Sequence, residues 1–201
     1  MSRPYAWFLW ISALAVALVS WRVLLLPLDL AMPAVAHYRP EVPLALFAHL
    51  LGGPLALLLA PFQLWGGLRR RHPALHRWSG RLYGLAVLTG GLGSLALLPH
   101  FTGTAFALTG FAALAVLWLA FTALGIARAR AGDIAAHRRW MRRSVALTLA
   151  AVTLRLVMAP LMLAGWSVVE TYQITAWGSW LLNLALLELW QARRARRPAM
   201  G

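Results

Sequence analysis

The chain has 201 residues, of which 61% are hydrophobic and only 12% are charged. A soluble domain of this length carries about twice that charged fraction, so the sequence excludes an ordinary water-soluble protein. The net charge of +14 would suggest a nucleic-acid partner in a soluble chain. Here the arginines lie in the gaps between apolar runs, and we expect no nucleic-acid partner. The chain has no cysteine, which excludes disulfides, thiolate metal sites and cysteine nucleophiles.

Apolar runs long enough to cross a bilayer, about 20 residues each, recur along the sequence. We predict an all-α, polytopic membrane bundle, because only a helix satisfies its own backbone hydrogen bonds in lipid. No segment has the composition of a linker, so residues 1–201 are expected to form one domain. The six predicted spans, in chain order, are Trp7–Leu26, Val42–Trp65, Leu82–Leu98 in a helix that begins at Pro73, Phe106–Ile126, Val145–Leu163 and Ile174–Leu189.

The arginines predict how these spans are oriented. Sixteen of the nineteen fall on one side of the predicted membrane: Arg3, the cluster Arg69–Arg81, the cluster Arg128–Arg143 and the tail Arg193–Arg197. Because arginine-rich loops stay in the cytoplasm, we predict that both termini are cytoplasmic. The expected partners are the lipid bilayer and, at the arginine-rich side, anionic lipid headgroups.

One short motif occurs twice, before the third span and before the fifth. The first copy is His76-Arg77-Trp78-Ser79-Gly80-Arg81, and the second is His137-Arg138-Arg139-Trp140-Met141-Arg142. Each follows a helix-start signal, Pro73 or Asp133, so both histidines lie near the electropositive first turn of a helix.

This position, together with the neighbouring arginines, disfavours imidazolium and keeps both histidines neutral. A neutral imidazole suits a metal ligand, and the same helix ends suit an acidic group such as a haem propionate. The candidate contacts to that group are Arg77, Arg81, Arg138 and Arg142. Alternatively, the arginines and tryptophans form only an interfacial belt, and His76 and His137 face water.

Two further histidines lie toward the other side of the membrane. His49 is about two turns into the second span, and His100 follows Pro99 between the third and fourth. In an antiparallel bundle, His49 and His100 would meet near the outer face, and His76 and His137 near the inner face. Two such pairs suit two stacked b-type haems, a layout that resembles cytochrome b561. The position of His100 before the fourth span departs from that pattern.

Two polar residues lie deep in the predicted bilayer. Arg155 is about 16 Å along the fifth helix from Ser144, and Asn183 is about 14 Å into the sixth from the outer side. A charged arginine near the middle of a bilayer costs at least ~2.5 kcal/mol, which marks a functional candidate. The alternative is a structural tie to Asn183 or to free backbone carbonyls. In either case we expect the Arg155 guanidinium to face the bundle interior.

Several stretches resemble a known family. They are GGPLALLLAPFQLW at 52–65, LRRRHPALHRWSGRLYG at 68–84, GDIAAHRRWMRRS at 132–144 and VTLR at 152–155. Together they span about 48–158 and are similar to a bacterial family of predicted membrane proteins, domain of unknown function 2306. The resemblance implies a multi-pass protein of a bacterial inner membrane, and it implies no activity.

Three functions stay open at this point, and the sequence does not decide whether the protein is an enzyme. The first is transmembrane electron transfer by b-type haem, with a quinone or another redox partner. The second is a small transporter, or an anion- or lipid-binding protein, that uses Arg155, Asn183 and the cytoplasmic arginines. The third is an accessory membrane subunit without a ligand.

Overall fold

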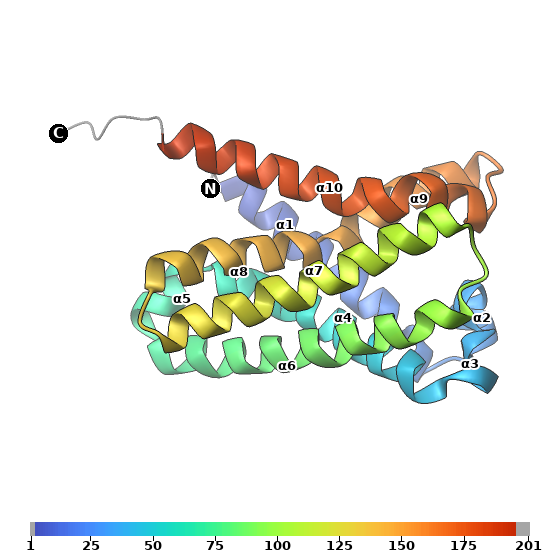
Figure 1. Ribbon diagram of the computed structural model, residues 1–201, viewed down its shortest axis with the longest axis horizontal. Coiled ribbons are helices and arrows are strands. Elements are labelled where there is room, and N and C mark those ends of the chain that lie inside the picture. The colour runs from blue at the N-terminus through green and yellow to red at the C-terminus, as the bar shows by residue number, and fades with distance from the viewer. Residues whose placement is uncertain (1–2, 196–201) are drawn as a thin grey trace.

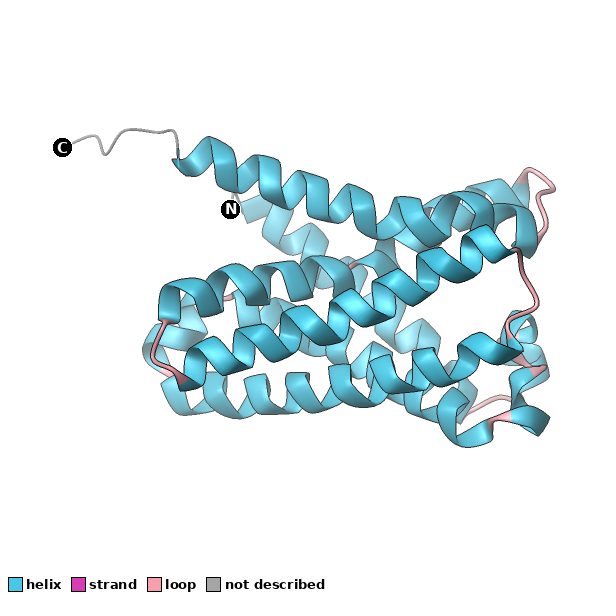
Figure 2. Ribbon diagram, in the orientation of Figure 1, coloured by secondary structure: helices cyan, strands magenta, loops and turns pink. Residues whose placement is uncertain are grey.

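The computed structural model describes residues 3–195, and every regular element in that range is a helix (Figures 1 and 2). The all-α prediction is therefore confirmed for these residues. Residues 1–2 and 196–201, with two arginines of the predicted tail, lie outside the described range. The elements are α1 (Arg3–Ser20), η1 (Trp21–Leu24), α2 (Leu28–Ala31), η2 (Pro33–Val35), α3 (Tyr38–Glu41), α4 (Pro43–Leu64), α5 (Gly66–Arg71), α6 (Pro73–Leu97), η3 (Leu98–His100), α7 (Ala105–Arg130), α8 (Ile134–Thr148), α9 (Ala150–Leu163) and α10 (Val168–Ala195).

Four helical segments of the described chain are long and apolar enough to cross a membrane. They are Pro43–Leu64, Pro73–His100, Ala105–Arg130 and Ile134–Leu163, with mean hydropathies from 1.6 to 2.1. They coincide with the second to fifth predicted spans and indicate a multi-pass membrane protein. The first and sixth predicted spans lie on α1 and α10, which do not combine the same length and apolarity. The total of six spans therefore stays a prediction.

Large apolar side chains cover the outside of the bundle, as expected of a surface that faces lipid. Leu25, Leu44 and Leu163 are 87%, 88% and 90% exposed. Inside, the main apolar cluster surrounds the fully buried Tyr83 and the buried Trp118. In water, exposed apolar surface of this extent would promote aggregation, so it supports a bilayer environment.

Helices α4 and α6 cross with their backbones almost in contact. A Cβ atom added to Gly52 would lie 2.6 Å from the amide nitrogen of Gly90, and one added to Gly93 would lie 2.7 Å from that of His49. Glycine is required here because any side chain would separate the two helices. The crossing holds the backbone of His49 against α6.

The fifth predicted span differs from the structure in where its helix begins and in its continuity. The sequence predicts one span over Val145–Leu163, whereas the helical segment begins at Ile134 and is interrupted at Leu149. No glycine or proline marks this interruption. Instead, α10 supports it from outside, because the Nδ2 group of Asn183 donates to the carbonyl oxygen of Ala146 at 3.1 Å.

The two ends of the bundle are formed by different helix ends (Figure 1). α5, the beginnings of α6 and α8, and the last turns of α7 and α10 lie together, while α2 and α3 lie at the opposite end. We call the first group the arginine-rich end, after Arg69, Arg70, Arg71, Arg77, Arg81, Arg128, Arg130, Arg138, Arg139, Arg142, Arg143, Arg193 and Arg194. α1 begins, and α10 ends, toward the arginine-rich end.

Candidate functional site

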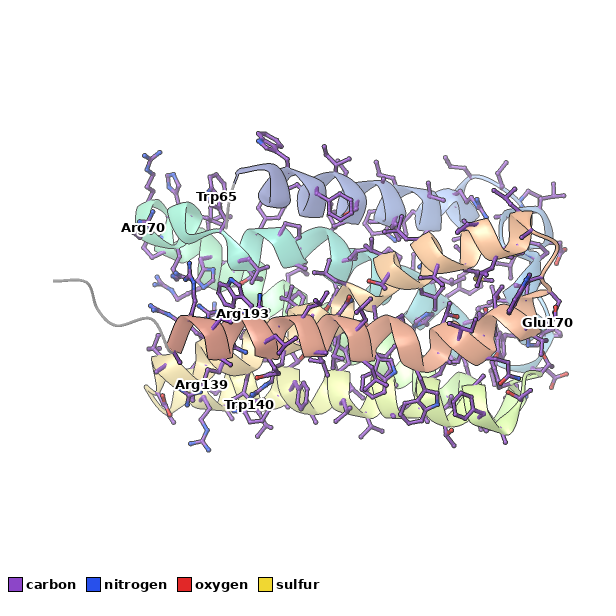
Figure 3. All side chains as sticks on the ribbon, turned by 90° about the horizontal axis from the view of Figure 1, so that it is seen from above. Trp65, Arg70, Arg139, Trp140, Glu170 and Arg193 are labelled. Carbon is purple, nitrogen blue, oxygen red and sulfur yellow. The ribbon has the colours of Figure 1, made fainter. Side chains whose placement is uncertain are left out.

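The arginine-rich end is built by two helix starts that bring the repeated motif to one level. Pro73 is the first residue of α6, where its fixed φ suits the first turn. Asp133 caps α8, because its Oδ1 accepts the amide hydrogen of Ala136 at 2.9 Å. Figure 3 shows Arg70, Arg139 and Arg193 at this end with Trp65 and Trp140, and Glu170 at the other.

His137 is held in one orientation by the preceding helix. Its Nδ1 lies 2.8 Å from the carbonyl oxygen of Gly125 on α7. A carbonyl only accepts, so Nδ1 carries the hydrogen and, in the neutral imidazole, Nε2 keeps a free lone pair. Nε2 is therefore the atom of His137 that can accept a proton, a hydrogen bond or a metal ion.

His76 lies on α6 near His137, close enough for their charges to interact. Its Nδ1 is buried and has no hydrogen-bond partner among the described residues. A buried polar nitrogen without a partner is costly, so this atom is available to a ligand. The structure thus places the two histidines of the repeated motif in one neighbourhood.

Four arginines from three helices interact with one another and reach this pair through Arg69. Burial, followed by the charge of the nearby Arg138, lowers the pKa of Arg69 on α5. Arg69 also interacts with the charge on His76, as does Arg77. The guanidinium of Arg142 on α8 interacts electrostatically with Arg194, Arg138 and Arg69. We call Arg69, Arg138, Arg142, Arg194, His76 and His137 the arginine–histidine cluster.

The two carboxylates on the described helices at this end are already engaged. Asp133 caps α8. Glu188 accepts from Arg143 twice, at 2.7 Å from Nε and 3.2 Å from Nη2. Among the described residues, no arginine of the arginine–histidine cluster forms an ion pair.

Tryptophans position several of the guanidinium groups instead. The Trp190 ring lies 4.6 Å from the guanidinium carbon of Arg194 and 5.4 Å from that of Arg142. These contacts hold two cations of the cluster near each other without neutralising either. Arg81, a predicted propionate contact, lies over the exposed Trp78 at 4.7 Å. Arg69 and Arg194 belong to the site although the motif did not single them out.

The outer histidines do not share a partner. The Nδ1 of His49 lies 2.7 Å from the hydroxyl of Ser94 and 3.2 Å from the carbonyl oxygen of Gly90, both on α6. The Nδ1 of His100 lies 3.9 Å from a carboxylate oxygen of Glu41. The two imidazoles therefore contact different groups.

Arg155 and Asn183 also have separate partners. The guanidinium of Arg155 donates to the carbonyl oxygen of Ala151 at 3.0 Å and to the hydroxyl of Ser20 at 3.1 Å. The Oδ1 of Asn183 accepts from the hydroxyl of Thr153 at 2.9 Å. Both Arg155 partners are neutral, and no ion pair involves Arg155 in the described part of the chain.

A buried hydroxyl network, which the sequence analysis missed, lies deeper between α6, α7 and α8. The hydroxyl of Tyr83 is 2.7 Å from those of Ser144 and Thr148. Thr148 also accepts from Trp118 Nε1 at 2.9 Å and donates to the carbonyl oxygen of Ser144. The hydroxyl of Thr122 lies 2.6 Å from that of Ser144 and donates to the carbonyl oxygen of Trp118. These six contacts share five hydrogens, one from each residue, so one contact always lacks a hydrogen.

Helix periodicity could have revealed this network. Tyr83 follows His76 by seven residues, and Ser144 follows His137 by seven. Residues at that spacing share a helix face, so the face that carries each histidine continues inward as a polar stripe.

The fold and the site define a multi-pass helical membrane protein with a cationic end. The chain matches the family described as predicted membrane protein DUF2306 over residues 46–191, and it belongs to this family. Comparison with curated proteins found no match, and neither did comparison with solved structures. The matched range contains His76, His137 and three of the four clustered arginines, but not Arg194. The family description names no activity, so function has to be argued from the site.

Proposed function

We propose that this membrane protein binds an acidic ligand, one that carries a phosphate or carboxylate group, at the arginine–histidine cluster. One observation carries the proposal. Four guanidinium groups from α5, α8 and α10 interact with one another beside two imidazoles, and none has a carboxylate partner among the described residues.

Unpaired like charges in one place repel, and partial burial strengthens the repulsion because the local dielectric is lower than in water. An anion relieves that repulsion and forms charge-assisted hydrogen bonds, which are about twice as strong as neutral ones. The buried Nδ1 of His76 adds a donor in the tautomer that carries its hydrogen there, whereas the Nε2 of neutral His137 can only accept, for example from an O–H of a monoprotonated phosphate. The site is therefore suited to an anion with several oxygens.

In the same proposal the arginine-rich end faces the cytoplasm of a bacterial cell, and α1 and α10 complete six spans. Sixteen of nineteen arginines on one side support this orientation. Reporter fusions placed after Ala195 and within the 101–104 turn test it. A cytoplasmic signal after Ala195 with a periplasmic signal at the turn is expected, and the reverse would contradict it.

A b-type haem held by His76 and His137 is the second candidate, and one observation favours it. The bond from His137 Nδ1 to the Gly125 carbonyl leaves Nε2 free, as in most metal-ligating histidines. When bound, the haem would supply one-electron chemistry, and Arg138 and Arg142 would hold its propionates. The outer pair, His49 and His100, stays a prediction for a second haem; both rings are contacted at Nδ1, from Ser94 and from Glu41 respectively.

An absorption spectrum of protein expressed with a haem supply tests this candidate. Sharp bands on reduction with dithionite that vanish in His137→Ala would support it. A colourless protein would exclude haem and leave the acidic-ligand proposal intact.

Thermal unfolding in detergent tests the main proposal. Inorganic phosphate replaces chloride at constant ionic strength, so that general screening stays unchanged. Phosphate should raise the Tm of the wild type but not of Arg69→Gln/Arg142→Gln. The control, Arg128→Gln/Arg130→Gln, removes two exposed arginines at the same end and should respond like the wild type. An equal rise in all three proteins would contradict the proposal.

A further inference from the structure

A pocket opens beside the arginine–histidine cluster, where α1 meets the junction of α4 and α5. Its volume is about 610 Å³, within the range of small-ligand pockets. One part of its wall is apolar or aromatic and another is cationic. Its lining includes Trp10, Leu64, Trp65, Gly66, Arg70 and Arg71.

Because Gly66 has no side chain, its backbone leaves a small recess in this pocket, which we call the cradle. A Cβ atom at this position would lie 3.2 Å from Nη1 of Arg70 and 3.7 Å from Nη2 of Arg69. The two guanidinium groups therefore border one space, and Arg69 also belongs to the arginine–histidine cluster. Arg69 therefore links the cluster to the edge of this pocket at Gly66.

The aromatic wall of the pocket is held by ring contacts between α1 and α4. The Trp10 ring packs edge-on against Phe62 at 4.5 Å between centroids and against Trp65 at 6.3 Å. Trp65 directly follows the last residue of the membrane-crossing α4. Tryptophan favours this level of a bilayer, where headgroups meet acyl chains.

Within residues 3–195, no carboxylate neutralises either cation of the pocket. Among the described residues, Arg70 and Arg71 form no ion pair. Guanidinium groups bind phosphate in a bidentate manner, and several of them suit its multiple oxygens better than a single carboxylate. Cationic and apolar walls meeting at the interface suit an amphipathic ligand with a phosphate at its polar end.

We propose that the ligand of the cluster is an anionic phospholipid, with its phosphate at Gly66 between Arg69 and Arg70 and one acyl chain along Trp10 and Leu64. This inference rests on the proposed function and adds the chemical class of the ligand. A soluble phosphate ester would use the arginines but gain nothing from the aromatic wall.

The test compares the affinities of the full-length protein in detergent for two probes, dioleoyl phosphatidic acid and glycerol 3-phosphate. The lipid should bind the wild type at least about tenfold more tightly than the soluble ester. Trp10→Ala should remove most of that advantage and leave glycerol 3-phosphate binding within about twofold. Gly66→Leu, which fills the cradle, should weaken both probes. Gly178→Leu is the matched control, because no atom lies within 4 Å of a Cβ there.

Equal affinities for the two probes, unchanged in Trp10→Ala, would overturn this inference and leave the proposed function standing with a soluble ligand. Binding of neither probe by the folded wild type would overturn both. If Gly66→Leu fails to fold, Trp10→Ala still decides between these outcomes.

Discussion

The Nδ1 atom of His137 donates its hydrogen to the carbonyl oxygen of Gly125 across the turn between α7 and α8. Gly132, with a φ of 77°, makes that turn possible. The bond therefore ties the start of one helix to the end of the previous one. It also determines which nitrogen of His137 is presented to a ligand.

Two substitutions of His137 should distinguish the contributions of its two ring nitrogens, Nδ1 and Nε2. The amide of asparagine can place a donor near Nδ1, whereas the longer glutamine places one near Nε2. His137→Asn should thus keep most of the stability, and His137→Gln should lose about 1 kcal/mol with the Gly125 bond. The free energy of unfolding in detergent measures the difference. Equal losses in both variants would show that the bond does not stabilise the fold.

The hydroxyl network predicts that Thr148→Val lowers the free energy of unfolding more than Tyr83→Phe does. Tyr83→Phe removes two contacts and one hydrogen, which leaves four contacts with four hydrogens, so the loss should be below about 1 kcal/mol. Thr148→Val keeps the shape but orphans the buried Trp118 N–H, which should cost about 1–3 kcal/mol. Thr109→Val, at an exposed hydroxyl, is the control. Denaturant unfolding that ranks Tyr83→Phe as the more damaging change would refute the hydrogen count.

Arg155 should be dispensable for stability. Its partners, Ala151 and Ser20, are neutral, while keeping a cation at this depth costs at least ~2.5 kcal/mol. Arg155→Leu should therefore leave the free energy of unfolding unchanged or raise it. Asn183→Leu should lower it by about 1 kcal/mol, because Ala146 and Thr153 lose a partner. A large loss in Arg155→Leu would identify Arg155 as a structural tie.

The phenol of Tyr38 on α3 should ionise at a higher pH than an exposed tyrosine. Burial, and next the nearby Tyr172, raises the pKa of Tyr38 from 10.0 to about 12. The folded state thus prefers the neutral phenol, so its contribution to stability is complete below pH 10 and is lost as the pH rises toward 12. The difference in phenolate absorbance between wild type and Tyr38→Phe should increase near pH 12. An increase near pH 10 would indicate an exposed ring.

Apolar runs and helix-start residues were enough to predict the central helices. The second to fifth predicted spans coincide with the four long apolar segments, and Pro73 begins α6 as expected. The interruption at Leu149 had no such signal, since its support comes from Asn183 on a distant part of the chain. Local sequence does not report which carbonyl another helix will contact.

The sequence predicted the position of the site residues along the membrane axis but not the direction in which their side chains point. Spacing along the helices placed His49 and His100 near one level, yet the α4–α6 crossing turns His49 toward Ser94. The contribution of Arg69 depends on α5, a short helix after Trp65 that the apolar pattern did not reveal. The inward direction of a side chain follows from packing, which one sequence does not contain.

The most direct test of the account is the dissociation constant for glycerol 3-phosphate, measured on purified protein at low and at physiological salt. Arg69→Gln/Arg142→Gln should raise the Kd at least about tenfold, because the charge-assisted contact of Arg69 and the nearby charge of Arg142 are lost together. Arg128→Gln/Arg130→Gln should change the Kd by less than about twofold at physiological salt, where exposed charges are screened. Equal weakening in both double variants would mean that the arginine-rich end attracts anions only through its total charge, and would contradict a defined site.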